Sequence, residues 1–248
     1  MSFRNLHPPF LTSVFLGLVI LGAISTPPVS GTKGAGHQTM AILGNQVQSR
    51  QAQLAYKAGI RQIEMTTSIS FVRSLEGSND STLSFLLESF VRKLSGIPDT
   101  PTNAGLNRIH AEMGAISREF RKELRAQVHP GHGNMSAIRR VAREAIKENA
   151  QLCELEATYW NTRLEAELAI FDAWIRHGDQ LIAKMEAEGC NITHLEKTLV
   201  SIRSLRGDLA SSLEDRDGER ITRVQREIVS LSKNYMNEIH KSGNIPMK

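Results

Sequence analysis

The sequence has little of what holds together a disulfide-rich or a β-rich protein. It contains two cysteines, eight prolines and 5% aromatic residues in 248 residues, and no stretch alternates apolar and polar residues over the length of a strand. Two cysteines exclude a disulfide-dense scaffold, and prolines and glycines that gather at a few punctuation points exclude a collagen-like repeat. Few aromatic residues are unusual for a globular α/β enzyme and typical of an elongated helical chain.

The charge composition is close to balanced. Thirty Lys and Arg stand against 26 Asp and Glu, which gives a net charge of +4, and 23% of the residues are charged. Together with 40% hydrophobic residues, this composition is that of a folded chain rather than of a disordered or polytopic membrane protein. The length allows one large domain or two small ones.

The most apolar segment lies near the N-terminus. Residues 10–24 are uncharged and mainly apolar, and Arg4 precedes them. This order predicts a secretory signal peptide over residues 1–25, with a retained signal anchor as the alternative. Either interpretation places the body of the protein outside the cytoplasm. Residues 26–37, rich in Pro, Gly and small side chains, are predicted to be a flexible linker.

Apolar residues recur at helical spacing through almost the whole body. The pattern predicts a pair of helices over residues 38–96, divided at Gly77. Gly96 is expected to end this pair in the left-handed conformation, ahead of Pro98, which cannot continue a helix. A polar loop then leads to a third helix that begins near Asn103.

The longest helices are predicted in the C-terminal half. Residues 135–188 contain no proline and one glycine, Gly178, so a single helix on the order of 80 Å is expected at about 1.5 Å per residue. A second long helix is expected over residues 192–241, with Gly218 as its weak point. Two long helices joined by a short turn pack antiparallel. The predicted fold class is therefore all-α, an elongated antiparallel bundle built on a long helical hairpin, with shorter N-terminal helices.

The predicted domain organisation follows from these elements. Residues 38–96 form an N-terminal helical pair, residues 103–241 form a coiled-coil-like bundle, and residues 242–248 form a C-terminal tail. The loop between the two sections is a candidate domain boundary, and one continuous bundle is equally consistent with the pattern.

Neither the cysteines nor the histidines form a recognisable site. On one long helix Cys153 and Cys190 would lie roughly 55 Å apart, too far for a disulfide. Cys153 is therefore expected to be a small buried residue, and Cys190, at the hairpin tip, is a candidate for a disulfide between chains. His129 and His132 flank a Pro-Gly corner and are weak metal candidates, because zinc and di-metal sites need three or four convergent ligands. A solvated corner is the better interpretation, and no cofactor is predicted.

Catalytic motifs are absent from the sequence. It contains no nucleophile elbow, P-loop or glycine-rich dinucleotide turn. Four glutamates in the predicted long helix could suggest paired carboxylates, but their spacing is typical of a solvated helix face. They are Glu154, Glu156, Glu165 and Glu167. The sequence therefore predicts a protein that is not an enzyme.

Three N-x-S/T sequons invite a comparison with helix starts. Asn134 and Asn191 stand where a helix needs an N-cap, which explains both residues without a glycan. Asn79, in a short turn between helices, is the glycosylation candidate.

Positively charged residues are most concentrated around the His-Pro-Gly corner at residues 129–133. Eight cations lie on the helical faces that flank it: Arg118, Arg121, Lys122, Arg125, Arg139, Arg140, Arg143 and Lys147. Residues 118–147 hold eight Lys and Arg against three Glu, a net of +5, whereas residues 148–196 hold ten Asp and Glu against three Lys and Arg, a net of −7. The basic corner could hold anionic lipid headgroups, an acidic glycan or an acidic protein. The alternatives are a solvated face and pairing with the acidic stretch of a second copy. Nucleic acid is not expected, because no aromatic side chains interleave the cations.

Three classes of function are compatible with these features. The first is a non-enzymatic scaffold protein, secreted or tethered to the outer face of the cytoplasmic membrane, that binds protein partners or self-associates along its helix faces. The second is a holdase chaperone. In outline the chain is similar to the Spy/CpxP-type cradle chaperones, although their L-T-x-x-Q motif is absent and this chain is longer. An exposed apolar patch on the N-terminal helices would favour the chaperone. A helical metal-binding protein or enzyme is the least supported class.

Overall fold

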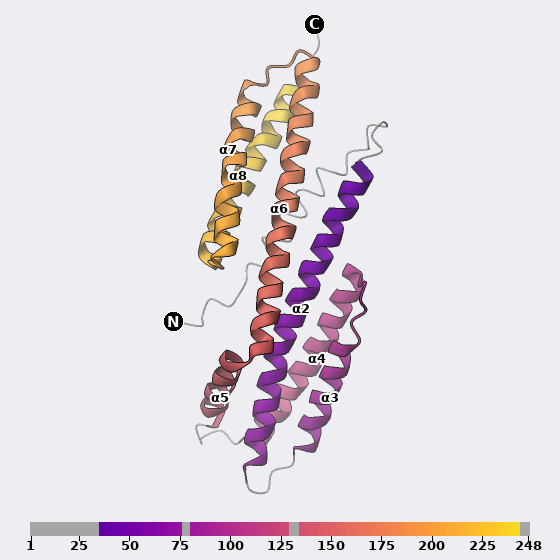
Figure 1. The fold of residues 1–248 in the computed structure, drawn as a ribbon, viewed down its shortest axis with the longest axis vertical. Coiled ribbons are helices and arrows are strands. Elements are labelled where there is room, and N and C mark those ends of the chain that lie inside the picture. The colour runs from indigo at the N-terminus through magenta and orange to yellow at the C-terminus, as the bar shows by residue number, and fades with distance from the viewer. Residues whose placement is uncertain (1–34, 76–79, 129–133, 244–248) are drawn as a thin grey trace. The chain divides into compact units, whose positions relative to one another are not determined.

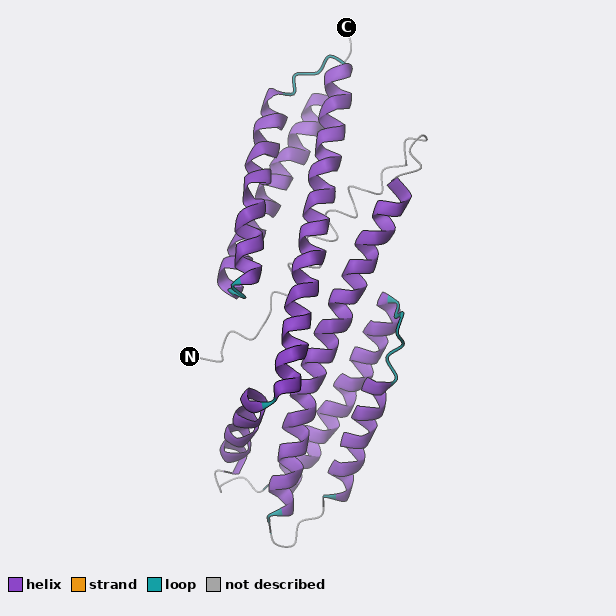
Figure 2. Cartoon of the chain, in the orientation of Figure 1, coloured by secondary structure: helices purple, strands orange, loops and turns teal. Residues whose placement is uncertain are grey.

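The protein is helical throughout the part of the chain that the structure describes. The structure, a computed structural model, describes residues 35–75, 80–128 and 134–243. Within these ranges the chain forms seven helices and no strand (Figures 1 and 2), so the predicted all-α class is confirmed. The predicted signal peptide lies outside the described residues, as do most of the predicted linker and tail.

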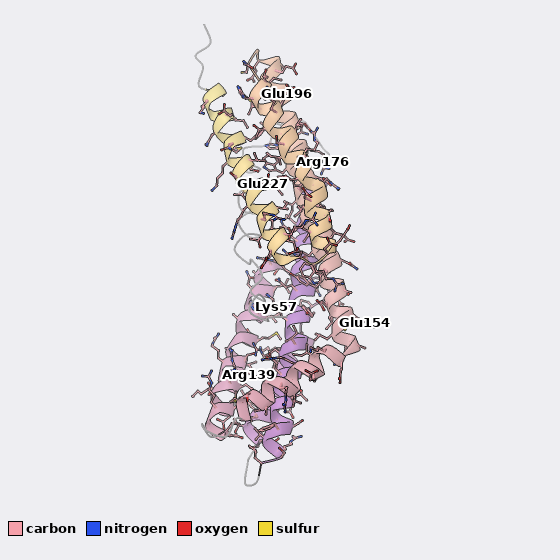
Figure 3. The ribbon with its side chains drawn as sticks, turned by 90° about the vertical axis from the view of Figure 1, so that its left-hand side faces the viewer. Lys57, Arg139, Glu154, Arg176, Glu196 and Glu227 are labelled. Carbon is pink, nitrogen blue, oxygen red and sulfur yellow. The ribbon has the colours of Figure 1, made fainter. Side chains whose placement is uncertain are left out.

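The described chain divides into two compact units. One is formed by residues 46–162, and the other by the described residues up to Asn45 together with those from Arg163 onward. We call the first the 46–162 unit and the second the C-terminal unit. Arg139 belongs to the 46–162 unit, whereas Arg176 belongs to the C-terminal unit (Figure 3).

The 46–162 unit is built from four helices and the beginning of a fifth. Their bounds are α2 Ala35–Arg73, α3 Ser81–Ser95, α4 Asn103–Gln127 and α5 Asn134–Glu148, with α6 beginning at Ala150. The apolar stripes predicted for these helices meet in one core, and α3 packs along α4. The buried residues of this core are Leu54, Ala58, Met65, Ile69, Val72, Leu83, Phe90, Leu106, Ile109, Met113, Phe120, Leu124, Val128 and Ile138. Since α2 begins at Ala35, it takes in the last three residues of the predicted linker.

The loop between α3 and α4 begins where it was predicted but with a different backbone. Gly96 has φ −85°, so the expected left-handed conformation is wrong. Its amide instead donates to the carbonyl of Arg92 at 3.1 Å, which continues the helical pattern for one more residue, and Pro98 follows. α4 then begins with a side-chain cap, because the hydroxyl of Thr102 accepts a hydrogen bond from the amide of Gly105 at 3.0 Å.

The single helix predicted over residues 135–188 is wrong, because the chain breaks at Asn149. α5 ends at Glu148, α6 runs over Ala150–Ala187, and α5 turns away from the first turns of α6 (Figure 1). The side-chain oxygen of Asn149 accepts a hydrogen bond from the amide of Leu152 at 2.8 Å. The same amide also lies 3.1 Å from the backbone carbonyl of Asn149, so the side chain of Asn149 reinforces the first turn of α6 as an N-cap.

The second arm of the predicted hairpin, residues 192–241, also breaks. The structure has α7 over Thr193–Glu214 and α8 over Gly218–Gly243, which pack against each other as an antiparallel pair. Arg216, with φ 55°, turns the chain in the left-handed region. The carboxylate of Asp217 then accepts hydrogen bonds from the amides of Glu219 and Arg220 at 3.1 and 3.0 Å, which caps α8. The weak point expected at Gly218 is thus the first residue of a new helix, α8.

A close approach joins α6 to its neighbours within the C-terminal unit. The hydroxyl of Tyr235, on α8, donates to the backbone carbonyl of Gly178, on α6, at 2.9 Å. A Cβ atom at Gly178 would lie 2.8 Å from Cδ1 of Leu199, on α7. The ring of Trp174 meets the ring of Tyr235 edge-on, with centroids 5.5 Å apart. The one glycine inside α6 therefore lies where side chains of α7 and α8 come close to the backbone of α6.

Candidate functional site

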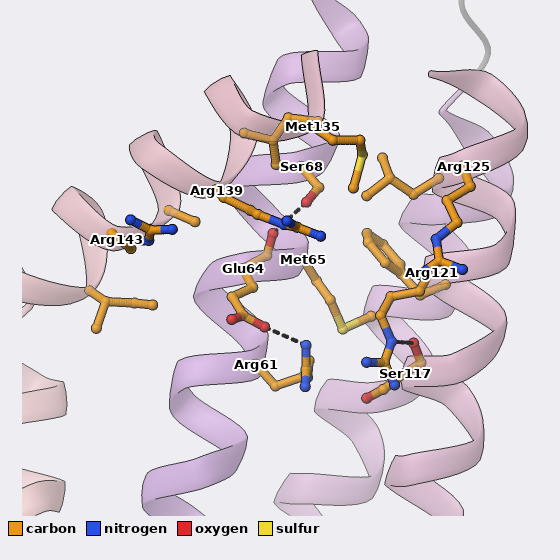
Figure 4. A pocket seen from close by; sticks show the side chains of 15 residues that line it. Arg61, Glu64, Met65, Ser68, Ser117, Arg121, Arg125, Met135, Arg139 and Arg143 are labelled. Carbon is orange, nitrogen blue, oxygen red and sulfur yellow. Dashed lines mark hydrogen bonds and ion pairs between the residues drawn. The ribbon is translucent and has the colours of Figure 1, made fainter. Parts of the chain in front are cut away.

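A pocket of about 330 Å³ opens in the 46–162 unit, between α2, α4 and α5 (Figure 4). Its lining combines five arginines and one glutamate with two serines and seven apolar side chains. The arginines are Arg61, Arg121, Arg125, Arg139 and Arg143. The structure thus brings four of the eight predicted cations, two from α4 and two from α5, to one site.

Helical spacing puts these cations beside the core rather than in it. Arg121 and Arg125 are four residues apart on α4, as are Arg139 and Arg143 on α5, so each pair shares a helix face. All four are exposed, while the neighbouring side chain Leu124 is buried. Long arginine side chains in such positions lay their apolar stems over the core and hold the guanidinium groups at the opening.

The floor of the pocket is apolar. Five of its side chains are buried members of the interior, and two are half-buried. The buried ones are Met65, Phe120, Leu124, Ile138 and Ala142, and the half-buried ones are Met135 and Ile146. Hydrogen bonds from arginine are stronger beside such a surface than in open water, because the effective dielectric constant is lower.

The charge in the pocket is strongly unbalanced. Glu64 is the only carboxylate in the lining and forms an ion pair with Arg61, so four positive charges remain in excess. Arg121 donates from Nε to the backbone carbonyl of Ser117 at 3.2 Å. Within the described ranges, neither Arg125 nor Arg139 has a hydrogen-bond or ion-pair partner. These two guanidinium groups are available to a bound anion.

The serine hydroxyls of the pocket are already engaged. Ser68 donates to the carbonyl of Glu64 at 2.7 Å, and Ser117 donates to the carbonyl of Met113 at 2.9 Å. Each bond joins residues four apart in the same helix, which is the usual way a helix accommodates an inward-facing serine. Neither hydroxyl is paired with a base that would activate it as a nucleophile.

The other four predicted cations do not line this pocket. Lys122 pairs with Glu119 at 3.1 Å, and Lys147 pairs with Glu144 at 3.7 Å, each on its own helix and exposed. Arg118 lies on the exposed face of α4 and, with Lys122, lines a surface recess that shares Arg121 and Arg125 with the pocket. The remaining cation is Arg140, which is exposed on α5.

The contribution of α2 to the pocket was missed by sequence reasoning. Arg61, Glu64, Met65 and Ser68 belong to this helix. The buried position of Met65 follows from its place in the apolar stripe. The neighbouring Arg61 and Glu64 carry no local signal, because their role depends on how α2 packs against α4 and α5.

One of the four glutamates assigned to a solvated face lies instead in the interior. Glu167 is 7% exposed, and its two carboxylate oxygens accept hydrogen bonds from Nε of Arg163 at 2.7 Å and from the amide of Gln225 at 2.6 Å. Arg163 and Gln225 are also buried, so the polar cluster is closed off from water. With both oxygens occupied, Glu167 is a structural group rather than an acid–base catalyst. Of the other three, Glu154 and Glu165 are exposed and Glu156 is half-buried.

The cysteines and histidines do not assemble a site in the described residues. Cys153 is exposed, so the expectation that it is buried is wrong, and Cys190 is half-buried; both are free thiols. Nowhere in residues 35–75, 80–128 or 134–243 do three His, Cys, Asp or Glu side chains gather as metal ligands. The metal candidates His129 and His132 lie outside the described residues, as does the glycosylation candidate Asn79.

The chain has no detected similarity to known proteins, so its pocket is the main indication of function. Among the described helices, none combines the length and apolar character needed to cross a membrane. No protein-family model matches the chain, and no curated protein and no solved structure matches it either. Function is therefore inferred from the geometry of the pocket and from the charge around it.

Proposed function

We propose that this protein is a non-enzymatic binding protein that acts outside the cytoplasm and recognises a negatively charged group through the pocket between α2, α4 and α5. One observation carries this proposal: five arginines from three helices surround one apolar pocket with a single carboxylate among them. Gathered like charges repel one another, so such a cluster favours an anionic ligand. Arginine also suits this role, because its planar guanidinium binds carboxylate or phosphate with two parallel hydrogen bonds.

The state of the other polar groups supports binding rather than catalysis. Glu64 is engaged with Arg61, and the hydroxyls of Ser68 and Ser117 donate to carbonyls of their own helices. A general base or nucleophile needs a free lone pair or an activating partner within hydrogen-bond reach. The other polar groups of the pocket are already hydrogen-bonded or ion-paired, so the cations can bind an anion but have no general base or nucleophile beside them.

The scaffold role extends this site along α4. The exposed cations outside the pocket continue the positive surface, so a partner that presents an anionic group in the pocket meets further positive charge beside it. The apolar run at residues 10–24 supports a location outside the cytoplasm. A holdase would instead need a continuous apolar surface. The large hydrophobic side chains that are strongly exposed in the described ranges, Phe85, Val141 and Val200, lie on three different helices.

The experiment is native affinity capture of the tagged full chain from its own envelope fraction, with quantitative mass spectrometry of proteins and lipids. Two double variants are compared with the wild type. Arg125→Gln with Arg139→Gln removes charge inside the pocket, and Arg118→Gln with Arg140→Gln removes the same charge from the same two helices outside it.

The expected result is a specific anionic partner or ligand that the pocket variant loses and the control variant still recovers, at a level between those of the pocket variant and the wild type. Equal recovery by both variants would contradict the proposal. A broad, substoichiometric set of unrelated proteins that neither variant changes would indicate a chaperone instead.

A further inference from the structure

We infer that the ligand of this pocket is a phosphate monoester that carries a single hydrocarbon chain. The inference rests on the proposed function, because it takes the arginine-lined pocket to be an anion-binding site. It adds the chemical class of the ligand, with the headgroup and the chain each supported by different residues of the lining.

The excess of cations favours a phosphate monoester over a carboxylate as the headgroup. The one carboxylate of the lining is paired with Arg61, and Arg121, Arg125 and Arg139 approach from α4 on one side and α5 on the other. A phosphate monoester has three terminal oxygens and close to two negative charges near neutral pH, so it can pair with arginines from both helices at once. A carboxylate has one charge and two oxygens, which leaves part of the cluster without a partner.

Two of the arginines are ready to bind. Arg125 and Arg139 have no hydrogen-bond or ion-pair partner among the described residues, and they stand on the two helices that face each other across the opening. No internal contact has to break before their guanidinium groups reach a phosphate. Arg121 already donates from Nε to a backbone carbonyl, which leaves the outer nitrogens of its guanidinium for a ligand.

The floor of the pocket favours a hydrocarbon chain. Seven of the 15 lining residues are apolar, and Met135 and Ile146 are only half-buried, so they keep apolar surface that a ligand can cover. The pocket volume of about 330 Å³ leaves room for several methylene groups beside the headgroup. The flexible thioethers of Met65 and Met135 can adapt their shape to such a chain.

The combination excludes simpler occupants. Inorganic phosphate would satisfy the arginines and leave the apolar floor against water. An aspartate or glutamate of a partner protein brings one charge and at most two methylene groups, which are too few to cover the floor. A neutral chain would bury apolar surface and leave the guanidinium groups of Arg125 and Arg139 without a counter-ion beside it.

The test is calorimetric titration of the full chain with four probes: dodecyl phosphate below its micelle-forming concentration, dodecanoate, inorganic phosphate and dodecyl maltoside. We expect dodecyl phosphate to bind about 100-fold more tightly than each of the others. Arg125→Gln with Arg139→Gln should weaken dodecyl phosphate about 100-fold, because charge-assisted hydrogen bonds to two guanidinium groups are lost. The matched variant Arg118→Gln with Arg140→Gln should retain wild-type affinity.

A floor variant separates the chain from the headgroup. Met135→Gln places a polar side chain at a half-buried position of the floor, so it should weaken dodecyl phosphate and leave the affinity for inorganic phosphate unchanged. Circular dichroism and the thermal midpoint of every variant are measured first, and the titrations are carried out at a temperature well below the lowest midpoint, so that every variant is folded.

Each other outcome overturns the inference in a recognisable way. If inorganic phosphate binds as tightly as dodecyl phosphate, the chain has no role and the proposed anion-binding function remains. Equal binding of dodecanoate refutes the phosphate headgroup. Equal binding of dodecyl maltoside shows an apolar site, and the proposed function then falls as well. If no probe binds while the capture experiment still loses a partner with the pocket variant, the ligand class is wrong and the proposed function stands.

Discussion

Gly178 is the clearest case of one residue that allows two helices to meet. A Cβ atom there would lie 2.8 Å from Cδ1 of the buried Leu199, whereas a Cβ atom at Gly207 would meet nothing within 4 Å. Both glycines are inside helices, so alanine gains about 1 kcal/mol of helix propensity at each. We expect Gly207→Ala to raise the free energy of unfolding. The free energy of unfolding of Gly178→Ala should be about 1–3 kcal/mol lower than that of Gly207→Ala, because the added methyl group overpacks the contact with Leu199. Urea unfolding of both variants measures this difference, and equal values would refute the close approach.

Tyr235 gives the fold a sensitivity to alkaline pH. Burial, with a contribution from the Asp179 carboxylate, raises the pKa of Tyr235 to about 12. Because this pKa lies above the value of about 10 in an unfolded chain, the folded state holds its proton more tightly. The resulting stability is present below pH 10 and is lost as the pH rises from 10 to 12.

The matching prediction concerns Tyr235→Phe. Below pH 10 this variant should be about 1 kcal/mol less stable than the wild type, since the hydrogen bond to the carbonyl of Gly178 is lost. The difference should shrink and then change sign as the pH rises from 10 to 12, because the wild type loses stability over this range and the phenylalanine variant does not. Unfolding curves at a series of pH values measure it, and a difference that does not change with pH would contradict the burial of this hydroxyl.

Single residues of the pocket differ in how far the sequence could reveal them. Arg121, Arg125, Arg139 and Arg143 were predicted as candidates, because cations four residues apart share a helix face whatever the fold. Arg61 could not be predicted, since it joins the site only through the packing of α2. The burial of Glu167 had a local signal that was overlooked: Arg163 lies four residues before it, and the buried Ile170 and Phe171 follow it on the same side of α6.

At the level of elements, the cap at Asn149 decides where α5 ends and α6 begins. Its side-chain oxygen accepts a hydrogen bond from the backbone amide of Leu152. Asn149→Ala should therefore lower the free energy of unfolding by about 1 kcal/mol. Asn149→Asp keeps an acceptor in the same place and is the control, with stability close to the wild type. Guanidinium unfolding of the two variants checks this, and an alanine variant as stable as the aspartate variant would show that the cap has no role.

Helices were easier to predict than the breaks between them. The 3–4 spacing of apolar residues is a local signal, so the beginnings of α4 and α7 could be placed to within a residue or two. An asparagine without a nearby glycine or proline is tolerated inside a helix and also caps one. Whether the helix continues through Asn149 or ends there depends on the packing of α5, whose Ile138 joins the core formed with α2 and α4. That packing joins parts of the chain far apart in sequence, and the periodicity of one segment does not contain it.

The described residues form two compact units, and we expect each unit to be destabilised independently of the other. Leu83 belongs to the 46–162 unit and Leu209 to the C-terminal unit, and both are fully buried. Truncation of either leucine to alanine should lower the free energy of unfolding of its own unit by about 2–5 kcal/mol. Hydrogen exchange measured by mass spectrometry should then accelerate in α3 and α4 for Leu83→Ala, and in α7 and α8 for Leu209→Ala. Acceleration in both places by one substitution would show a single cooperative unit.

The buried cluster of Arg163, Glu167 and Gln225 has a consequence for how this sequence can change over generations. Loss of Glu167 alone leaves Arg163 buried without its carboxylate, which costs about 3–5 kcal/mol. Replacement of all three by apolar residues of similar size is often neutral or stabilising. Unfolding free energies of Glu167→Ala and of the triple variant Arg163→Met, Glu167→Leu and Gln225→Leu would show this contrast. The three residues are then inherited as a set: a lineage keeps them together or replaces them together, and the one-step intermediates between those states are the variants least able to persist.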